Sequence, residues 1–433
     1  MTEFAEPRAH VGTNDGAARR ARRHAAERRF RLYGILAIVV AVSFLVLLLG
    51  SIAVQGYTAF TATQIRLDVS FAPEVIDPDG TGDPELWAGA DYGSLIRHSL
   101  GARFPAVREP EEARALMALI SSGARFDLRD MVLDDPGLIA TTRPVWLPAA
   151  ADIDMLVKGI IPRDAPEGAR RVKDNQIAWL DALVAEGAVE RAPHLRFFTA
   201  GDSRAPERAG IWGAIVGSFY TMVVTLVLAF PIGVLTAVYL EEFAPKSRWI
   251  DLVEVNINNL AAVPSIVFGL LGLAVFLNVY HLPRSAPVVG GMTLALMTLP
   301  TIIIATRSAL AAVPPSIREA ALAVGASPLQ VVMHHTLPAA MPGVLTGTII
   351  GMARALGETA PLLMIGMVAF IADIPGGPSD PATVLPVQVF LWADSPERAF
   401  VEKTAAATLV LLVFLIAMNG LAVYLRKKFE KRW

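Results

Sequence analysis

Long apolar runs dominate the pattern of hydrophobic and polar positions along the chain. A membrane-spanning helix needs about 20 predominantly apolar residues to cross roughly 30 Å of hydrocarbon. We expect such helices at residues 32–54, 211–240, 260–280, 288–306, 343–371 and 405–425. The pattern therefore predicts an all-α polytopic membrane protein with six transmembrane helices.

The segment between the first two predicted spans, residues 55–210, has a different character. It holds 24 of the chain's 40 acidic residues and is rich in Pro and Asp. Residues 109–122 and 173–186 repeat apolar positions with a helical period, and residues 65–71 alternate like a strand. We expect a small soluble α+β domain here, and the pattern leaves its topology open.

Charge distribution gives the chain a predicted orientation. The chain is 54% hydrophobic, and basic residues crowd residues 1–31 and 426–433. Basic runs can bind nucleic acid, but these two abut apolar spans, so the positive-inside rule favours two cytoplasmic tails and no nucleic-acid partner. The alternating spans then place residues 55–210 outside the cytoplasm, which is the periplasm in a Gram-negative cell.

The same reasoning divides the chain into five parts. Residues 32–54 could be a cleaved signal peptide, but about 30 residues precede them, which favours a retained anchor. The predicted parts are a basic cytoplasmic tail (1–31), a first transmembrane helix (32–54), a periplasmic domain (55–210), a core of five further transmembrane helices (211–425) and a second basic tail (426–433). The chain has no Cys, so neither disulfides nor Cys-ligated metals are available.

The loop at residues 314–338, on the predicted cytoplasmic side, carries the signals of two short helices. Prolines at its start suit a first helical turn, and Gly325 can supply a left-handed C-terminal residue. Ser327 is placed as an N-cap, followed by Pro328 in the first turn of a second helix, which we expect Pro338 to interrupt. The result is a compact corner between two spans.

This corner resembles the EAA motif of ABC-type importer permeases. The resemblance rests on Glu319-Ala320-Ala321, on Gly325 and on the later pair Leu337-Pro338. It implies that this corner docks in a groove on an ATP-binding subunit and couples ATP hydrolysis to transport. The sequence departs from the family at His335, where an aliphatic residue is usual.

Two charges lie inside the predicted fifth span. Arg354 and Glu358 are four residues apart, so on a continuous helix they share a face and can pair. Ionisable residues inside spans are functional candidates by default. The alternative is a purely structural pair, but replacing buried pairs with apolar residues is often neutral or stabilising. Because the planar guanidinium matches the oxygens of an oxyanion, we expect both residues to line a substrate translocation path.

Residues 354–363 closely resemble the corresponding helix of the phosphate-specific permease family. The ending Ala360-Pro361-Leu362-Leu363 is similar to that of its A-type subunits, called PstA. The likeness covers about residues 211–426, and the insertion at 55–210 resembles an N-terminal domain of some such permeases. The resemblance implies translocation of inorganic phosphate across the bacterial inner membrane. The implied partners are a C-type permease subunit, two ATP-binding subunits and a periplasmic phosphate-binding protein.

Other functions fit the sequence less well. Within the class, the cargo could be phosphonate, molybdate or sulfate. A membrane sensor is disfavoured because the sequence has no cytoplasmic output domain. An enzyme is disfavoured because His334-His335 lacks the His-Glu-x-x-His spacing, and the absence of a P-loop assigns ATP hydrolysis to a separate subunit. The sequence therefore predicts no catalytic residue, cofactor or metal.

The charge asymmetry yields a test of topology. A reporter enzyme that is active only outside the cytoplasm is expected to work when inserted beside Gly168, and to be silent beside Ser316 or after Trp433. Equal expression of the three fusions is the control. Activity at Ser316 would contradict the six-span arrangement.

Overall fold

The computed structural model describes residues 13–429, so residues 1–12 and 430–433 of the two predicted tails lie outside the described residues. The chain divides into two compact units, residues 1–54 and 55–433. The first consists of most of helix α1 (Thr13–Gly56). Its apolar side chains are exposed over the predicted first span, as suits a helix whose solvent is lipid.

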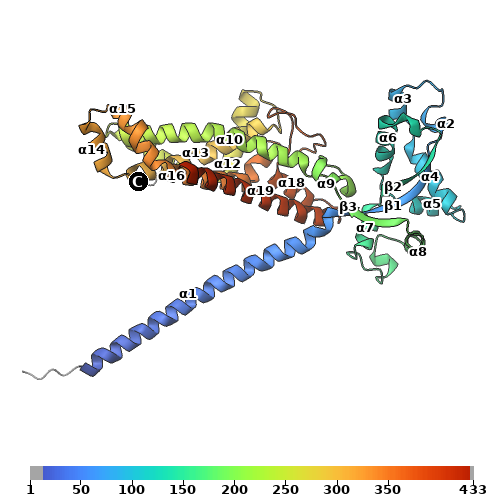
Figure 1. The fold of residues 1–433 in the computed structure, drawn as a ribbon, viewed down its shortest axis with the longest axis horizontal. Coiled ribbons are helices and arrows are strands. Elements are labelled where there is room, and N and C mark those ends of the chain that lie inside the picture. Colours follow the sequence, from blue (N-terminus) through green and yellow to red (C-terminus); the bar gives the residue numbers. More distant parts are fainter. Residues whose placement is uncertain (1–12, 430–433) are drawn as a thin grey trace, which may run out of the picture. The chain divides into compact units, whose positions relative to one another are not determined.

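A three-stranded antiparallel sheet organises the soluble domain that follows (Figure 1). The central strand β1 (Thr61–Ser70) lies between β2 (Thr142–Pro148) and β3 (Val189–Pro193). Ile65 pairs with Leu147 on one side and Val189 on the other. Alternate residues of β1 are buried, so the strand predicted at residues 65–71 is confirmed.

Short helices cover this sheet and complete the core of the domain. They are α2 (Pro73–Ile76), α3 (Pro84–Ala88), α4 (Tyr92–Arg103), α5 (Pro110–Met117), α6 (Ala124–Asp134), α7 (Ala151–Val157) and α8 (Asp174–Ala185). Helix α9 (Arg196–Thr199) instead belongs, through Phe197, to a separate apolar cluster with Ile211 and Trp392. Leu100, Leu128 and Leu180 are completely buried against strand residues such as Leu67. The predicted soluble α+β domain is therefore confirmed, with α5 and α8 at the two predicted helical patterns.

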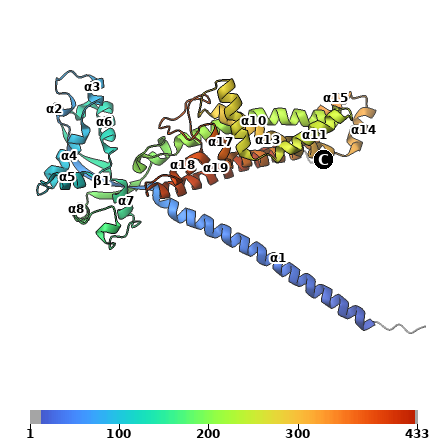
Figure 2. The same cartoon turned by 180° about the vertical axis from the view of Figure 1, so that it is seen from behind.

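Long helices form the membrane core. They are α10 (Trp212–Val238), α11 (Arg248–Ala261), α13 (Pro287–Ala311), α16 (Leu337–Gly357) and α19 (Phe400–Phe429), with the shorter α12 (Ser265–Gly272), α17 (Ala360–Met364) and α18 (Leu385–Ala393). Figures 1 and 2 show α10, α13, α16 and α19 side by side. Within residues 13–429, five helices are long and apolar enough to span a membrane. The number is six if α11 and α12, bent by 102° at Pro264, count as one span.

Small residues bring these helices close together. A Cβ on Gly343 of α16 would lie 2.6 Å from the Cβ of Ala309 on α13, so only glycine fits there. Thr225 and Thr298 are buried, and each donates its hydroxyl proton to the carbonyl one turn earlier. Close packing of small residues and internally satisfied hydroxyls are what helix association in lipid requires.

The fifth span differs from the prediction. Helix α16 ends at Gly357, and Glu358 already has extended backbone angles (φ −80°, ψ 121°), so residues 343–371 do not form one helix. Glycine weakens a helix, and Pro361 has no N–H to donate to the carbonyl of Gly357. The apolar composition of the segment hides this break, because hydropathy does not register backbone chemistry.

The predicted interruption at Pro338 is also wrong. A π-helical turn, η7 (Val332–Thr336), leads directly into α16, and Pro338 lies in the first turn of that helix. A wider turn accommodates the proline ring, because the backbone preceding it is displaced from regular α-helical geometry. The second helix of the corner therefore continues into the fifth span.

Buried charges join the soluble domain to α19. Lys158 Nζ lies 2.6 Å from Asp154 Oδ2 and 2.9 Å from Glu402 Oε1. The side chains of Lys158 and Glu402 are only 2% and 7% exposed. Thr58 donates its hydroxyl proton to the second oxygen of Glu402 at 2.8 Å. Buried charges are tolerated when they are paired and hydrogen-bonded, so these contacts hold the domain to the N-terminal end of α19.

A histidine extends this charged joint. Lys403 Nζ lies 2.7 Å from His194 Nδ1, and His194 Nε2 lies 3.0 Å from the carbonyl oxygen of Glu207. His194 Nδ1 also lies 3.2 Å from the carbonyl oxygen of Ala59. A neutral imidazole protonated at Nε2 can accept from the ammonium and donate to the carbonyl of Glu207. Burial and the charge of Lys403 lower the pKa of His194 to about 4, which keeps the ring neutral.

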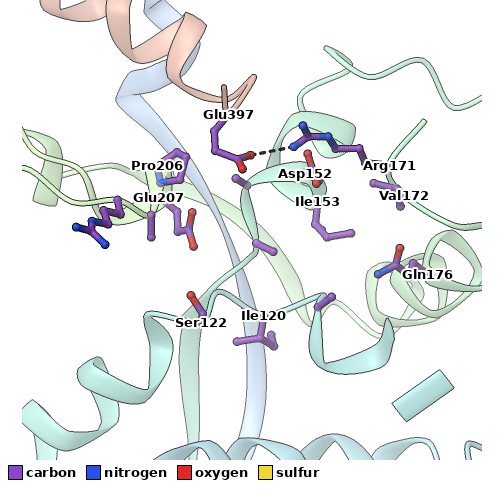
Figure 3. A pocket seen from close by; sticks show the side chains of 15 residues that line it. Ile120, Ser122, Asp152, Ile153, Arg171, Val172, Gln176, Pro206, Glu207 and Glu397 are labelled. Carbon is purple, nitrogen blue, oxygen red and sulfur yellow. Dashed lines mark hydrogen bonds and ion pairs between the residues drawn. The ribbon is translucent and has the colours of Figure 1, made fainter. Parts of the chain in front are cut away.

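A cavity of about 530 Å³ lies close to this joint (Figure 3). Asp152 of α7 and Glu207 project into it, and Arg171 pairs with Glu397 of the α18–α19 loop at 2.9 Å. This exposed pair is a second ionic contact between the soluble domain and the core. Exposed pairs contribute little free energy, so this pair adds little to the attachment.

The neutral His194 generates a prediction about pH. The unfolded chain binds a proton near the ordinary His pKa of 6.5, whereas the folded chain does so only near pH 4. The contribution of His194 to stability is therefore fully present above pH 6.5 and is lost as the pH is lowered toward 4, a loss of up to about 3 kcal/mol.

The measurement is the thermal unfolding of the detergent-purified chain between pH 7.5 and 4.5. His194→Gln is expected to flatten the fall in Tm, because it removes the titrating group. His98→Gln, at an exposed position, is the matched control and should keep the wild-type slope. An unchanged slope in His194→Gln would show that this imidazole does not control acid stability.

Candidate functional site

The corner between α13 and α16 folds as its local residues dictate. Helix α14 (Pro315–Ala323) begins with prolines and is followed by Gly325 at φ +88°, a left-handed conformation that favours glycine. Ser327 caps α15 (Pro328–Val331): its hydroxyl accepts from the Gln330 backbone N–H, and Gln330 accepts from the Ser327 N–H. Figure 1 shows α14 and α15 at one end of the helix bundle.

The motif residues face different ways within this corner. Glu319 and Ala320 are exposed, whereas Ala321 is buried, because consecutive helical positions point in different directions. Leu337 and Pro338 are half-buried at the start of α16. The corner thus offers Glu319 and Ala320 to a partner, while Ala321 and Leu337 face the chain's own helices.

Apolar side chains surround the exposed motif residues. Leu322, Val324 and Leu329 are all exposed, and Val324 is 84% exposed. An apolar group at the tip of a polar loop is typical of a surface that another protein covers. The corner therefore has the exposed apolar and acidic groups that a docking element needs.

Five charged residues behind the corner, here called the arginine clamp, were missed from sequence. The members are Glu241, Glu242, Glu254, Arg307 and Arg318. Arg307 pairs with Glu241 at 3.3 Å and Glu254 at 2.8 Å, and Arg318 pairs with Glu242 at 2.7 Å. The sequence did contain a signal for these pairs. Glu241-Glu242 and Arg307 each follow directly after an apolar run, and the six-span arrangement places the ends of both runs on the same side of the membrane.

The two candidate translocation residues do lie together, although not on one helix. Arg354 is in the last turn of α16, and Glu358 follows the helix end. Arg354 Nε lies 3.5 Å from Glu358 Oε1. Within residues 13–429, no hydrogen bond engages the terminal nitrogens of Arg354, and its side chain is 52% exposed. The guanidinium therefore keeps donors available beyond its carboxylate partner.

Contacts of nearby residues show at which level along α13 the Arg354–Glu358 pair lies. Gly351 packs opposite Thr298 and Ile302 of α13, and Leu362 packs against Gly290 near the start of α13. Arg354 and Glu358 lie between these two levels, and so are level with the middle of a 25-residue apolar helix. A helix that ends at such a depth is tolerated where the freed backbone is buried in protein or lines a water-filled cavity.

The sequence falls into two regions when compared with known families. Residues 229–431 match the family described as binding-protein-dependent transport system inner membrane component. Residues 17–167 match a domain of unknown function, DUF3333. The first match defines the class of protein that the spans and the corner compose, namely the membrane permease of an importer.

Curated relatives narrow this class. The phosphate transport system permease protein PstA of Haemophilus influenzae is 31% identical over 56% of this chain and 84% of its own length. PstA of Yersinia pestis is 33% identical over 51% and 74%. Among solved structures, the inward-facing MetNI methionine ABC transporter is 18% identical over 51% of this chain and 95% of its own, with a TM-score of 0.41.

The chain belongs to the PstA family of phosphate transport system permease proteins. It is a multi-pass inner membrane protein and a permease subunit of an ABC importer, which is not itself an enzyme. The predicted fold class and permease class are thereby confirmed. The roles of individual residues in the corner and beside Arg354 stay predictions.

The positive φ of Gly325 gives a test of the corner. A Cβ at Gly325 would meet nothing within 4 Å, so any effect of substitution comes from backbone conformation alone. Gly325→Val is expected to disfavour the left-handed corner by about 1–2 kcal/mol, a population shift of roughly 5- to 30-fold. ATP-dependent uptake by the assembled importer should fall accordingly, at normal protein abundance.

Gly325→Asn is the matched control, because asparagine tolerates the left-handed region and should retain most uptake. Equal uptake by the Val and Asn variants would show that the corner conformation is unimportant for coupling.

Proposed function

We propose that this chain carries inorganic phosphate across the inner membrane as the A-type permease subunit of an ABC importer. A C-type permease subunit, two ATP-binding subunits and a periplasmic phosphate-binding protein complete the proposed complex. Membership of the PstA family supports the cargo. The observation that carries the proposal is the half-exposed Arg354 at the depth of the middle of α13.

An arginine at this depth is costly if it faces lipid. Insertion scales assign about 2.5–3.5 kcal/mol to a charged side chain at the centre of a span. The exposed side of Arg354 must therefore face another protein or water. A second permease subunit packed on this face would enclose Arg354 and Glu358 between the two subunits, where a substrate can pass.

The chemistry of the pair suits a protonated oxyanion. The free guanidinium nitrogens of Arg354 can donate to phosphate oxygens, and the planar fork matches their geometry. Glu358 weakens this hold through its charge, and it can accept a hydrogen bond from a protonated phosphate oxygen. Conduction requires a site that admits the ion and also releases it.

The break after Gly357 supports the same function. It leaves the carbonyl end of α16 beside Arg354, and a cation there is favoured by the helix dipole. Broken helices at binding sites near the bilayer midplane are a recurring feature of transporters. The backbone break and the charge thus occur at the same place.

The remaining parts of the proposal follow the predicted topology. Both tails and the corner at residues 314–338 are proposed to be cytoplasmic, where Glu319, Ala320 and Gly325 meet the ATP-binding subunit, and Ala321, Leu337 and Pro338 hold the corner on α16. The domain of residues 55–210 is proposed to be periplasmic. Its charged joint to α19 keeps it on the opposite end of the bundle from the corner.

Other oxyanions are the competing cargo. Sulfate and molybdate carry no proton near neutral pH, so neither could donate to Glu358. Phosphate can, which favours it over those two, whereas phosphonate shares the property. These cargoes can be distinguished by measuring how strongly each unlabelled anion competes with radiolabelled phosphate for uptake.

Arg354 gives the sharpest test of the path. Arg354→Ala is expected to lower phosphate uptake at least tenfold without preventing assembly, and Arg354→Lys to restore it only in part, because lysine lacks the planar fork. Uptake of radiolabelled phosphate into membrane vesicles, normalised to the amount of complex, measures both. Arg284→Lys, at an exposed loop position, is the control and should transport normally.

A double variant distinguishes the path from a structural pair. If the pair only stabilises the helix end, Arg354→Leu combined with Glu358→Leu should restore both abundance and uptake. If the pair lines the path, the double variant assembles but does not transport. A transporting double variant would therefore refute the translocation role.

A further inference from the structure

We infer that Arg318 is the positioning residue that links the coupling corner to the membrane spans. This inference rests on the proposed function, because it assigns a route by which a displacement caused by the ATP-binding subunits reaches the membrane helices. It names a single side chain, immediately before the exposed Glu319, as the polar connection between the corner and the spans.

The contacts of Arg318 join three elements. Its guanidinium pairs with both oxygens of Glu242, at 2.7 Å and 3.3 Å. It also donates to the carbonyl oxygens of Leu310 and Val313, each at 2.9 Å. Glu242 belongs to η5 (Tyr239–Phe243), the π-helical end of α10, and Leu310 belongs to the end of α13. One side chain of α14 thus holds the inner ends of two spans.

Arginine is required by this geometry. Four hydrogen bonds in different directions use the fixed fork of five N–H donors, which a lysine ammonium cannot reproduce. The last carbonyls of a helix also lack partners within the helix, and a cation there is favoured by the helix dipole. Glu242 is only 10% exposed, so the pair is partly shielded from water and from salt screening.

The rest of the arginine clamp extends the connection. Arg307 of α13 pairs with Glu241, next to Glu242, and with Glu254 of α11. A displacement of α14 therefore acts on α13, on the end of α10 and, through Arg307, on α11. Contiguous ion pairs between rigid helices are a physical route for coupling, although coupling itself must be measured.

The test compares ATP hydrolysis with uptake in the fully assembled complex. Arg318→Gln and Glu242→Gln are expected to leave assembly and binding-protein-stimulated ATP hydrolysis within about twofold of wild type. The phosphate transported per ATP hydrolysed should fall at least fivefold. For Arg318→Lys, the phosphate transported per ATP hydrolysed should lie between the value of these variants and that of wild type, because lysine keeps the charge but lacks the planar fork.

A purely structural role predicts another pattern. Abundance would then decrease while the ratio of uptake to hydrolysis stayed at the wild-type value, and that outcome would overturn the inference. Lys246→Gln is the matched control, since Lys246 is an exposed cation in the α10–α11 loop and forms no ion pair among the described residues. Its ratio should be unchanged.

A second measurement does not depend on the cargo. Because this chain has no native Cys, spin labels attached at Ser316→Cys and Leu235→Cys before assembly are its only labelled sites and report the distance between α14 and α10. Arg318→Gln should broaden the distribution of distances in the assembled complex, and an unchanged distribution would contradict the clamp. Failure of the wild-type complex to transport phosphate would instead refute the proposed function and leave this distance result standing.

Discussion

The low polarity of the bilayer is the constraint on which the rest of this structure depends. Charged side chains and unsatisfied backbone groups are costly in hydrocarbon, so each must be paired, placed at a helix end or faced away from lipid. Lys158 and Glu402 are paired at the N-terminal end of α19, and the arginine clamp is paired behind the corner. Arg354 is also paired, with Glu358, but half of its side chain stays exposed at the level of the middle of α13. That exposure is the basis of the proposed function.

The two sets of paired charges lie at opposite ends of the helix bundle, and each attaches another part of the chain to it. The joint at Glu402 attaches the soluble domain to the last span through buried, paired charges. The clamp at Arg318 fixes the corner to the ends of α10 and α13. Between them, helices with glycine contacts such as Gly343 pack too closely to deform gradually, which suits movement as rigid bodies.

The sequence pattern predicted those features that depend on residues close together in the chain. The alternation in β1, the period of α8, the left-handed Gly325 and the cap at Ser327 were all readable from neighbouring residues. The helix end at Gly357 was not predicted, because hydropathy averages over the segment and does not register the missing N–H of Pro361. The ion pairs were not predicted because their partners are far apart in sequence: 76 residues separate Arg318 from Glu242, and 244 separate Lys158 from Glu402. Arg354 and Glu358 were recognised as unusual charges, but their exposure required the structure.

The central claim, that this chain forms a path for phosphate, is tested most directly by reconstitution. The complete complex in proteoliposomes, supplied with ATP and the periplasmic binding protein, should accumulate radiolabelled phosphate. Unlabelled phosphate should compete, whereas sulfate and molybdate should not. Complexes assembled without this chain should accumulate none. Phosphate accumulation by complexes that lack this chain would contradict the account. So would uptake that is abolished by sulfate or molybdate but not by unlabelled phosphate.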